Sequence, residues 1–194
     1  MNLETLALDK LYPNKMPLHV ATVQHEDRCK VYGSIIPPSN YNKQDILNYI
    51  TERYKTEKGQ NNGQLVCWQS DYFLHKQTKL LDGLIDILND KVNYFVGLKH
   101  GYRLYVSEMW AAVYAKGNYA NLHGHGKYCQ FSGVLYLQSE EGHPGITFED
   151  NFFLPATENT AYFFDSNYKH SVDASTIDSL RVILGFNFYL NIPK

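Results

Sequence analysis

Short apolar runs separated by turn residues fill the carboxy-terminal half of the chain, and this pattern limits the folds that the chain can adopt. The runs are rich in β-branched and aromatic residues, as strands are, and they span residues 104–114, 131–138, 145–148, 160–164 and 180–190. Many short strands at such spacing are typical of a small sandwich or jelly roll. We therefore expect a β-rich core in this half of the protein.

Two segments ahead of this core have helical periodicity instead. Apolar residues recur at helical spacing from Asn42 until the pattern stops in a polar run at residues 58–63. A stronger apolar stripe over about residues 78–98 is wide enough to pack on a sheet. Two strand-like runs, residues 19–23 and 30–36, precede both helices, and we expect them to flank the main sheet.

Helices followed by a block of strands predict an α+β protein that is mainly β. We expect a double-stranded β-helix, which is the jelly-roll or cupin-like fold, with amino-terminal helices buttressing one sheet and a ligand cavity between the sheets. The 194 residues contain no internal repeat or long linker, so we expect a single domain over residues 1–194. Helical support is expected over about residues 40–100 and the β-helix core over about residues 101–192.

Composition and charge limit the classes of partner and the cellular compartment that we expect for this protein. The chain has 18 basic and 20 acidic residues, so no broad basic field gathers nucleic acid or an anionic membrane surface. The amino terminus lacks the blocks of a signal peptide, and no apolar run approaches the length of a membrane span. Cys29, Cys67 and Cys129 stand at unrelated spacings, which favours free thiols in a reducing compartment. We expect a cytoplasmic protein without membrane or nucleic-acid partners; a homodimer stays open, because the sequence identifies no interface.

A histidine pair in one short extended segment forms a candidate metal site. His123 and His125 are separated by one glycine, and side chains two apart leave the same face of an extended chain, so both imidazoles can converge on one cation. His170 is the candidate third ligand. Three protein ligands on one face of an octahedral iron leave positions for a bidentate cosubstrate and dioxygen. Cys129 and Asp165 are weaker candidates, because buried cysteines are common and carboxylates are usually solvated.

An arginine in the last expected strand is the candidate anchor for an anionic ligand. Arg181 shares a face of that strand with Gly185 and Asn187, a face with few bulky groups. A buried guanidinium needs an anionic partner, and its planar fork suits a carboxylate, so a dicarboxylate is a reasonable ligand. Tyr114 and Tyr136 lie on neighbouring expected strands and could donate hydrogen bonds to the same carboxylate.

Simpler interpretations of these residues stay open. Arg181 could form a salt bridge inside the sheet, with Asp173, Glu149 or Asp178 as the partner. Tyrosines in strands are more often core residues than cofactor contacts. A histidine pair in a loop is often solvated, so the metal interpretation depends on His170 and Arg181 as well.

Further motifs of the carboxy-terminal half carry a resemblance to a known family. In chain order they are Trp110, Tyr114, Gly117, His123, His125 and residues 132–137, then Pro155, Phe163, Phe164, residues 170–172, Arg181, Phe186 and Asn187. In this order they closely resemble the 2-oxoglutarate/Fe(II)-dependent oxygenases of phages and marine bacteria, relatives of prolyl hydroxylases. The resemblance covers roughly the carboxy-terminal half of the chain.

The resemblance implies a non-haem Fe(II) oxidoreductase that uses 2-oxoglutarate as cosubstrate and hydroxylates a peptide side chain or a small molecule. It implies that iron is bound by His123, His125 and His170. It also implies that 2-oxoglutarate is bound by Arg181, Tyr114, Tyr136 and Asn187. The metal ligands and the anchor are thus the same residues that the sequence pattern singles out. No further catalytic residue is implied.

The chain also departs from the family's pattern. The usual facial triad has a carboxylate where His125 stands, so this site would carry one negative charge fewer. Ala112 stands where asparagine is common, Ile183 replaces a polar residue, and Asp165 and Ser166 replace the common Pro-Ser pair. These changes affect the expected cosubstrate geometry more than metal binding.

Two other functions fit part of the same pattern. A three-histidine cupin-type metalloenzyme without 2-oxoglutarate is one, because Gly117, His123 and His125 match the start of a cupin motif. Gln130, however, stands about where cupins place a glutamate ligand, and the later proline-glycine-histidine part is absent. A non-catalytic domain on the same fold is the other alternative, and bound metal would distinguish it from both enzymes.

Overall fold

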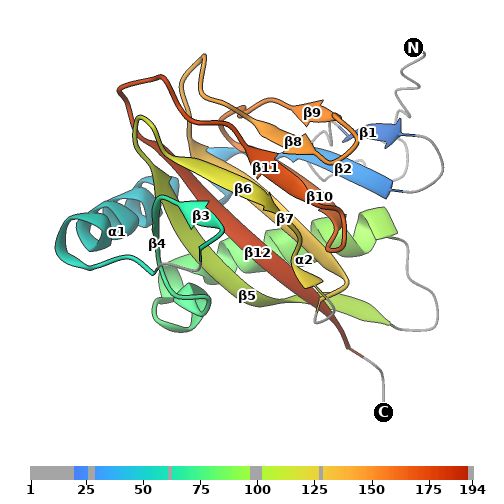
Figure 1. The fold of residues 1–194 in the computed structure, drawn as a ribbon. Helices are drawn as coiled ribbons and strands as arrows, with labels where there is room; N and C mark the ends of the chain where they lie inside the picture. The colour runs from blue at the N-terminus through green and yellow to red at the C-terminus, as the bar shows by residue number, and fades with distance from the viewer. Residues whose placement is uncertain (1–19, 26–28, 61–62, 97–101, 127–128, 192–194) are drawn as a thin grey trace.

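Two antiparallel β-sheets pack face to face, and helices cover the outer side of one of them (Figure 1). The computed structural model describes residues 20–25, 29–60, 63–96, 102–126 and 129–191. The architecture is α+β and mainly β, and it is the double-stranded β-helix that the order of elements predicts.

Within the described residues the larger sheet has seven strands, and each neighbouring pair is antiparallel. In spatial order they are β1 (Val20–His25), β2 (Cys29–Ile35), β10 (Thr160–Asp165), β7 (Phe131–Gln138), β12 (Arg181–Asn191), β5 (Arg103–Tyr114) and β4 (Trp68–Gln69). The expected flanking strands near the amino terminus are therefore confirmed as β1 and β2, although residue 19 lies outside the described residues.

In the part of the chain that the structure describes, the smaller sheet has five strands, most of them short. In spatial order they are β3 (Leu65–Val66), β6 (Tyr119–His123), β11 (His170–Val172), β8 (Ile146–Phe148) and β9 (Phe153–Leu154). The strand expected at residues 145–148 is confirmed as β8. The others had not been predicted as strands. β3, β9 and β11 have only two or three residues, which are too few for a periodic signal, and β6 has five, of which only its last residue, His123, lies in the predicted extended segment.

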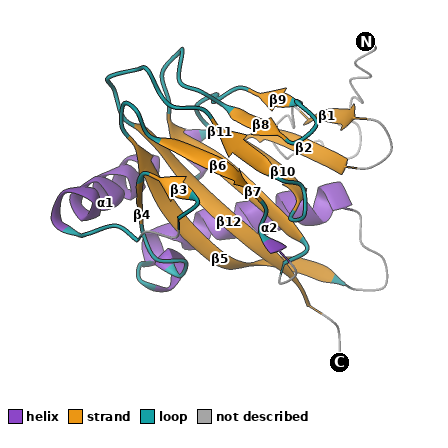
Figure 2. Ribbon diagram, viewed as in Figure 1, coloured by secondary structure: helices purple, strands orange, loops and turns teal. Residues whose placement is uncertain are grey.

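Two helices pack on the outer face of the larger sheet (Figure 2). They are α1 (Lys43–Thr56) and α2 (Asp82–Val96), and short 3-10 turns lie at Pro38–Asn40, Leu74–Lys76 and Lys79–Leu81. The buried stripe of α2 is Leu84, Leu88 and Val92. Both predicted helices are confirmed, but the second begins later than expected, because the Thr78 hydroxyl caps a 3-10 turn before it; residues 97 and 98 lie outside the described residues.

No helix in the described part of the chain combines the length and the apolar character that a membrane span requires.

The alternation of β12 separates a core face from a cavity face. Phe186 and Phe188 are completely buried beneath the helices, in the same apolar cluster as Leu88. Arg181 and Gly185 face the other way and line the space between the sheets. Because β12 pairs with β5 and β7, the side chains of all three strands that share this second face project toward the smaller sheet.

Candidate metal centre and cavity

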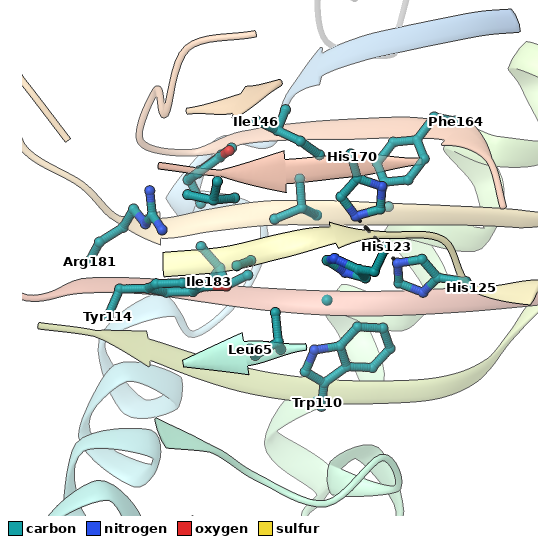
Figure 3. A pocket seen from close by; sticks show the side chains of 16 residues that line it. Leu65, Trp110, Tyr114, His123, His125, Ile146, Phe164, His170, Arg181 and Ile183 are labelled. Carbon is teal, nitrogen blue, oxygen red and sulfur yellow. Dashed lines mark hydrogen bonds between the residues drawn. The ribbon is translucent and has the colours of Figure 1, made fainter. Parts of the chain in front are cut away.

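The three predicted metal ligands meet at one end of the space between the sheets. His123 ends β6, His125 follows two residues later, and His170 begins β11 directly opposite His123 in the antiparallel pair. One ligand atom from each residue lies within 4.8 Å of the other two, and the Nε2 atoms of His125 and His170 are 3.5 Å apart (Figure 3). These distances allow all three rings to bind one cation.

Backbone carbonyls fix the orientation of two of the rings. Nδ1 of His123 is 2.7 Å from the Asn121 oxygen, and Nδ1 of His170 is 3.1 Å from the Tyr168 oxygen. A carbonyl oxygen only accepts, so Nδ1 carries the hydrogen in both rings and Nε2 keeps its lone pair. This is the arrangement by which proteins usually orient histidine ligands.

Burial keeps the histidines neutral. It lowers the pKa of His123, lowers the pKa of His125 to about 4 with a further contribution from His123, and takes the pKa of His170 well below its usual value. Neutral imidazole is the form that binds metal, so at neutral pH no proton has to leave before a cation binds.

The same shifts predict an acid-sensitive metal-free protein. In the unfolded chain these histidines gain protons near pH 6.5, whereas burial delays protonation in the folded state. The unfolded state then binds more protons below pH 6.5, so the unfolding free energy should fall as the pH falls, by up to about 1.4 kcal/mol per pH unit for each histidine. Denaturant unfolding between pH 7 and pH 5 measures this slope. A constant free energy over that range would contradict neutral histidines.

The weaker candidate ligands lie outside the histidine cluster. Asp165 accepts a hydrogen bond from the Asn167 backbone, 2.8 Å away, and so caps a turn. The Cys129 thiol lies 3.7 Å from the Ser132 hydroxyl, and Gln130 accepts a hydrogen bond from the Leu190 backbone. Within the described residues, the three histidines are the group of side chains that could hold a metal ion.

Arg181 is almost completely buried, with 1% of its surface exposed. Its guanidinium carbon lies 4.1 Å from the centre of the Tyr114 ring, and Nη1 donates a hydrogen bond to the Pro144 carbonyl. Nε is buried without a hydrogen-bond partner. No carboxylate of the described residues forms an ion pair with this guanidinium, and Asp178 pairs with Lys116 instead.

A cavity of about 50 Å³ connects the histidines with Arg181, which lie at its opposite ends (Figure 3). Tyr114 and Tyr136 line it, and both are 2% exposed. Burial raises the pKa of both hydroxyls, so they stay protonated and able to donate hydrogen bonds. Asn187 is not among the lining residues; its amide bonds to Ser132 and Glu108 near the metal end.

The segment that contains β3 and β4, which belong to different sheets, brings residues to the cavity that the sequence did not identify. Leu65 lines the cavity, and the Cys67 thiol lies near the Tyr114 hydroxyl and the Arg181 guanidinium. Burial raises the pKa of the Cys67 thiol to about 12, so this cysteine is a neutral neighbour of Arg181 rather than a nucleophile. Short strands paired far along the chain leave no local signal from which this contact could be found.

Trp110 forms one wall beside the metal centre. Its ring stacks on His125 with centroids 5.6 Å apart and planes 28° apart. The indole has room because β12 carries Gly185 opposite it: a Cβ there would lie 2.4 Å from the indole ring. Close approach of a ring to the backbone therefore requires glycine at this position.

The Gly185→Ala substitution should push Trp110 away from His125. We expect the unfolding free energy to fall by about 1–3 kcal/mol, the usual range for overpacking, and the tryptophan fluorescence to change. Gly83→Ala is the control, because a Cβ at that position in α2 meets nothing within 4 Å and alanine favours helix. The prediction is wrong if the two variants unfold alike in denaturant titrations.

Comparison with known proteins gives the same fold. The sequence matches no protein-family model and no curated protein. It is similar in structure to a viral collagen prolyl hydroxylase from Paramecium bursaria Chlorella virus-1 in complex with 2-oxoglutarate (16% identity, TM-score 0.57, 78% of this chain and 91% of the other). It is also similar to a Pseudomonas putida prolyl-4-hydroxylase (16% identity, TM-score 0.62, 82% of this chain and 91% of the other). A further similar structure is the epimerase SnoN in complex with Fe³⁺, α-ketoglutarate and nogalamycin RO (10% identity, TM-score 0.63, 81% of this chain and 78% of the other). At these identities the likeness establishes the fold.

Proposed function

We propose that the chain is a non-haem Fe(II)- and 2-oxoglutarate-dependent dioxygenase that hydroxylates a peptide side chain or a small molecule. The observation that carries the proposal is one cavity with three converging imidazoles at one end and a buried guanidinium without a carboxylate partner at the other. A dicarboxylate can bind the metal with one end and Arg181 with the other. The viral prolyl hydroxylase with 2-oxoglutarate and SnoN with Fe³⁺ and α-ketoglutarate support this choice of cofactors.

The residues present fit both groups. Neutral imidazole is a suitable ligand for iron, and three protein ligands leave open positions for a cosubstrate and dioxygen. At the other end, the unpartnered Nε of Arg181 is a buried donor that a carboxylate would satisfy. His123, His125 and His170 would hold the iron, and Arg181 would hold the distal carboxylate.

The protein's own contribution is binding, orientation and exclusion of water. Arg181 would fix the cosubstrate by its charge and planar fork, while the protonated hydroxyls of Tyr114 and Tyr136 would donate to the same carboxylate. Trp110 and Phe164 line the metal end with apolar surface, which would limit the access of water to the reacting atoms. With iron and 2-oxoglutarate bound, dioxygen would be the oxidant: one oxygen atom would convert a substrate C–H bond to C–OH, and the other would enter the cosubstrate, which would leave as succinate and carbon dioxide.

Difference spectroscopy and product analysis test the proposal against the three-histidine cupin alternative. Protein loaded with Fe(II) without oxygen should develop a visible absorption band when 2-oxoglutarate is added, and should release succinate when oxygen is admitted. The absence of both would favour the cupin enzyme. Gln130 already argues against a standard cupin site, since its side chain bonds to the Leu190 backbone. Absence of metal binding after iron loading would favour a non-catalytic domain.

The similar structures support the proposed substrate classes. A prolyl hydroxylase that acts on collagen supports a peptide substrate, and an epimerase in complex with nogalamycin RO supports a small molecule. We further propose that residues 1–194 form a single oxygenase-like domain. In support, β2, β3 and β4, from the first half of the chain, each pair with a strand of the second half.

A further inference from the structure

A row of hydrogen-bonded side chains crosses three adjacent strands beside the metal centre. Asn187 of β12 lies between Glu108 of β5 and Ser132 of β7, and the register pairs it with both. Its amide nitrogen donates to the Glu108 carboxylate at 2.6 Å, and its amide oxygen accepts from the Ser132 hydroxyl at 2.8 Å. Because the acceptor and donor bonds fix both ends of the amide, Asn187 has one orientation.

The same amide lies beside a metal ligand. Ser132, which donates to Asn187, is 3.7 Å from the Cys129 thiol, and that thiol is 3.9 Å from the His125 carbonyl oxygen. The Asn187 side chain also acts on the His125 ring in the sense that favours the ring N–H. Nε2 of His125 points toward His170, so Nδ1 is the ring nitrogen left for the amide oxygen. The row therefore runs from the His125 ring through Asn187 to the Glu108 carboxylate. Asn187 is 4% exposed, which shields these bonds from water.

His125 differs from the other two ligands in this respect. Nδ1 of His123 and Nδ1 of His170 each face a backbone carbonyl, whereas His125 connects to a charged carboxylate through an amide. His125 is also the position where the usual triad has a carboxylate. No lysine or arginine of the described residues forms an ion pair with Glu108. Its charge is therefore available to the metal centre rather than neutralised by a neighbouring cation.

We propose that Glu108, acting through Asn187, is the positioning residue that compensates for the missing carboxylate ligand by orienting His125 and making it a stronger donor. This inference rests on the proposed function. A divalent ion carries two positive charges, Arg181 carries one, and 2-oxoglutarate carries two negative charges. With three neutral histidine ligands the loaded site therefore has a net charge of one positive unit. Glu108 supplies one negative charge that reaches the metal ligand through a single side chain, Asn187, and such outer partners raise ligand basicity.

Cobalt(II) binding to the purified full chain tests the inference, with cobalt(II) as a spectroscopic substitute for iron(II). Glu108→Gln keeps an oxygen that can accept from Asn187 but removes the charge, and we expect about tenfold weaker binding and a shift of the visible cobalt bands. Glu149→Gln is the matched control: this exposed carboxylate follows Phe148, which pairs with His170, but has no bond to a ligand ring. It should bind cobalt like the wild type.

A double variant separates charge from folding. In Glu108→Gln/Asn187→Asp the carboxylate moves one step closer to His125, and the amide introduced at position 108 can donate to it. The bond between positions 108 and 187 is then kept in reverse, and the other bonds of the row keep their direction. We expect cobalt affinity within about threefold of the wild type, well above that of the single Glu108→Gln variant. Thermal unfolding of the metal-free proteins shows whether a variant is folded, and the double variant carries the test if the single one is not.

The outcomes distinguish this inference from the proposed function. If the wild type binds cobalt and Glu108→Gln binds it equally well with unchanged bands, the role of Glu108 is refuted while the proposed function stands. The same holds if the folded double variant fails to recover affinity. If the wild type binds no cobalt, the metal site and this inference are both overturned.

Discussion

Replacing Arg181 with methionine is expected to weaken 2-oxoglutarate binding at least a hundredfold while leaving metal binding intact. The guanidinium is buried and would make charge-assisted hydrogen bonds to the distal carboxylate, and losing such a partner typically costs about 2–5 kcal/mol. A loss of about 2.8 kcal/mol corresponds to the hundredfold change. Titration of the Fe(II)-loaded protein with 2-oxoglutarate, without oxygen, measures the dissociation constant.

Lys116→Met is the control for this substitution, because it also removes a cation but one that forms an exposed pair with Asp178. It should bind 2-oxoglutarate like the wild type. We also expect the unfolding free energy of metal-free Arg181→Met to fall little or even to rise, since the buried guanidinium has no carboxylate partner in the described residues. Equal cosubstrate affinity in both variants would rule out Arg181 as the anchor.

Replacing His170 with alanine should remove bound metal and abolish succinate release. One ligand of three contributes roughly 4 kcal/mol of metal affinity, which is about a thousandfold. Metal analysis after iron loading and gel filtration measures the loss. The ring also packs against Phe148 and Phe164, so a modest loss of stability is expected from the space that alanine leaves.

His143→Ala is the matched histidine control for metal binding. His143 is also buried, but its two ring nitrogens lie 3.2 Å from the Ser175 and Ser179 hydroxyls, away from the cluster. It should keep its metal, although the loss of two hydrogen bonds should lower its unfolding free energy. A folded His170→Ala protein with full metal content would contradict the assigned centre.

The longer elements could be predicted from the sequence because their periodicity reflects the surfaces they bury. The stripe of α2 and the alternation of β12 each record contact with one apolar layer, so helix and strand were assigned correctly. Strands β3, β4 and β9 have two residues each and exist because a longer strand elsewhere provides hydrogen-bond partners. Such pairing depends on the finished sheet and leaves no periodic trace in the chain.

The candidate site was also predicted only in part. Histidine and arginine have few roles in a sheet interior, so residue type and spacing alone identified His123, His125, His170 and Arg181. The structure brings these four to one cavity. The neighbourhood of Asn187 could not be predicted, because its partners Glu108 and Ser132 come from strands distant in sequence. Their alignment depends on the register between three strands, which local patterns do not encode.

The two sheets contribute unequally to the cavity, and this has a mechanical consequence. His123 and His170 belong to the smaller sheet, which has no helical cover in the described residues, while Arg181 belongs to the larger sheet beneath α1 and α2. A ligand bound by the histidines at one end and by Arg181 at the other would crosslink the smaller sheet to the larger sheet, which the helices support. Amide hydrogen exchange in β6 and β11 should therefore slow when iron and 2-oxoglutarate bind. The smaller sheet should gain more stability than the larger one, because no helix of the described residues supports it.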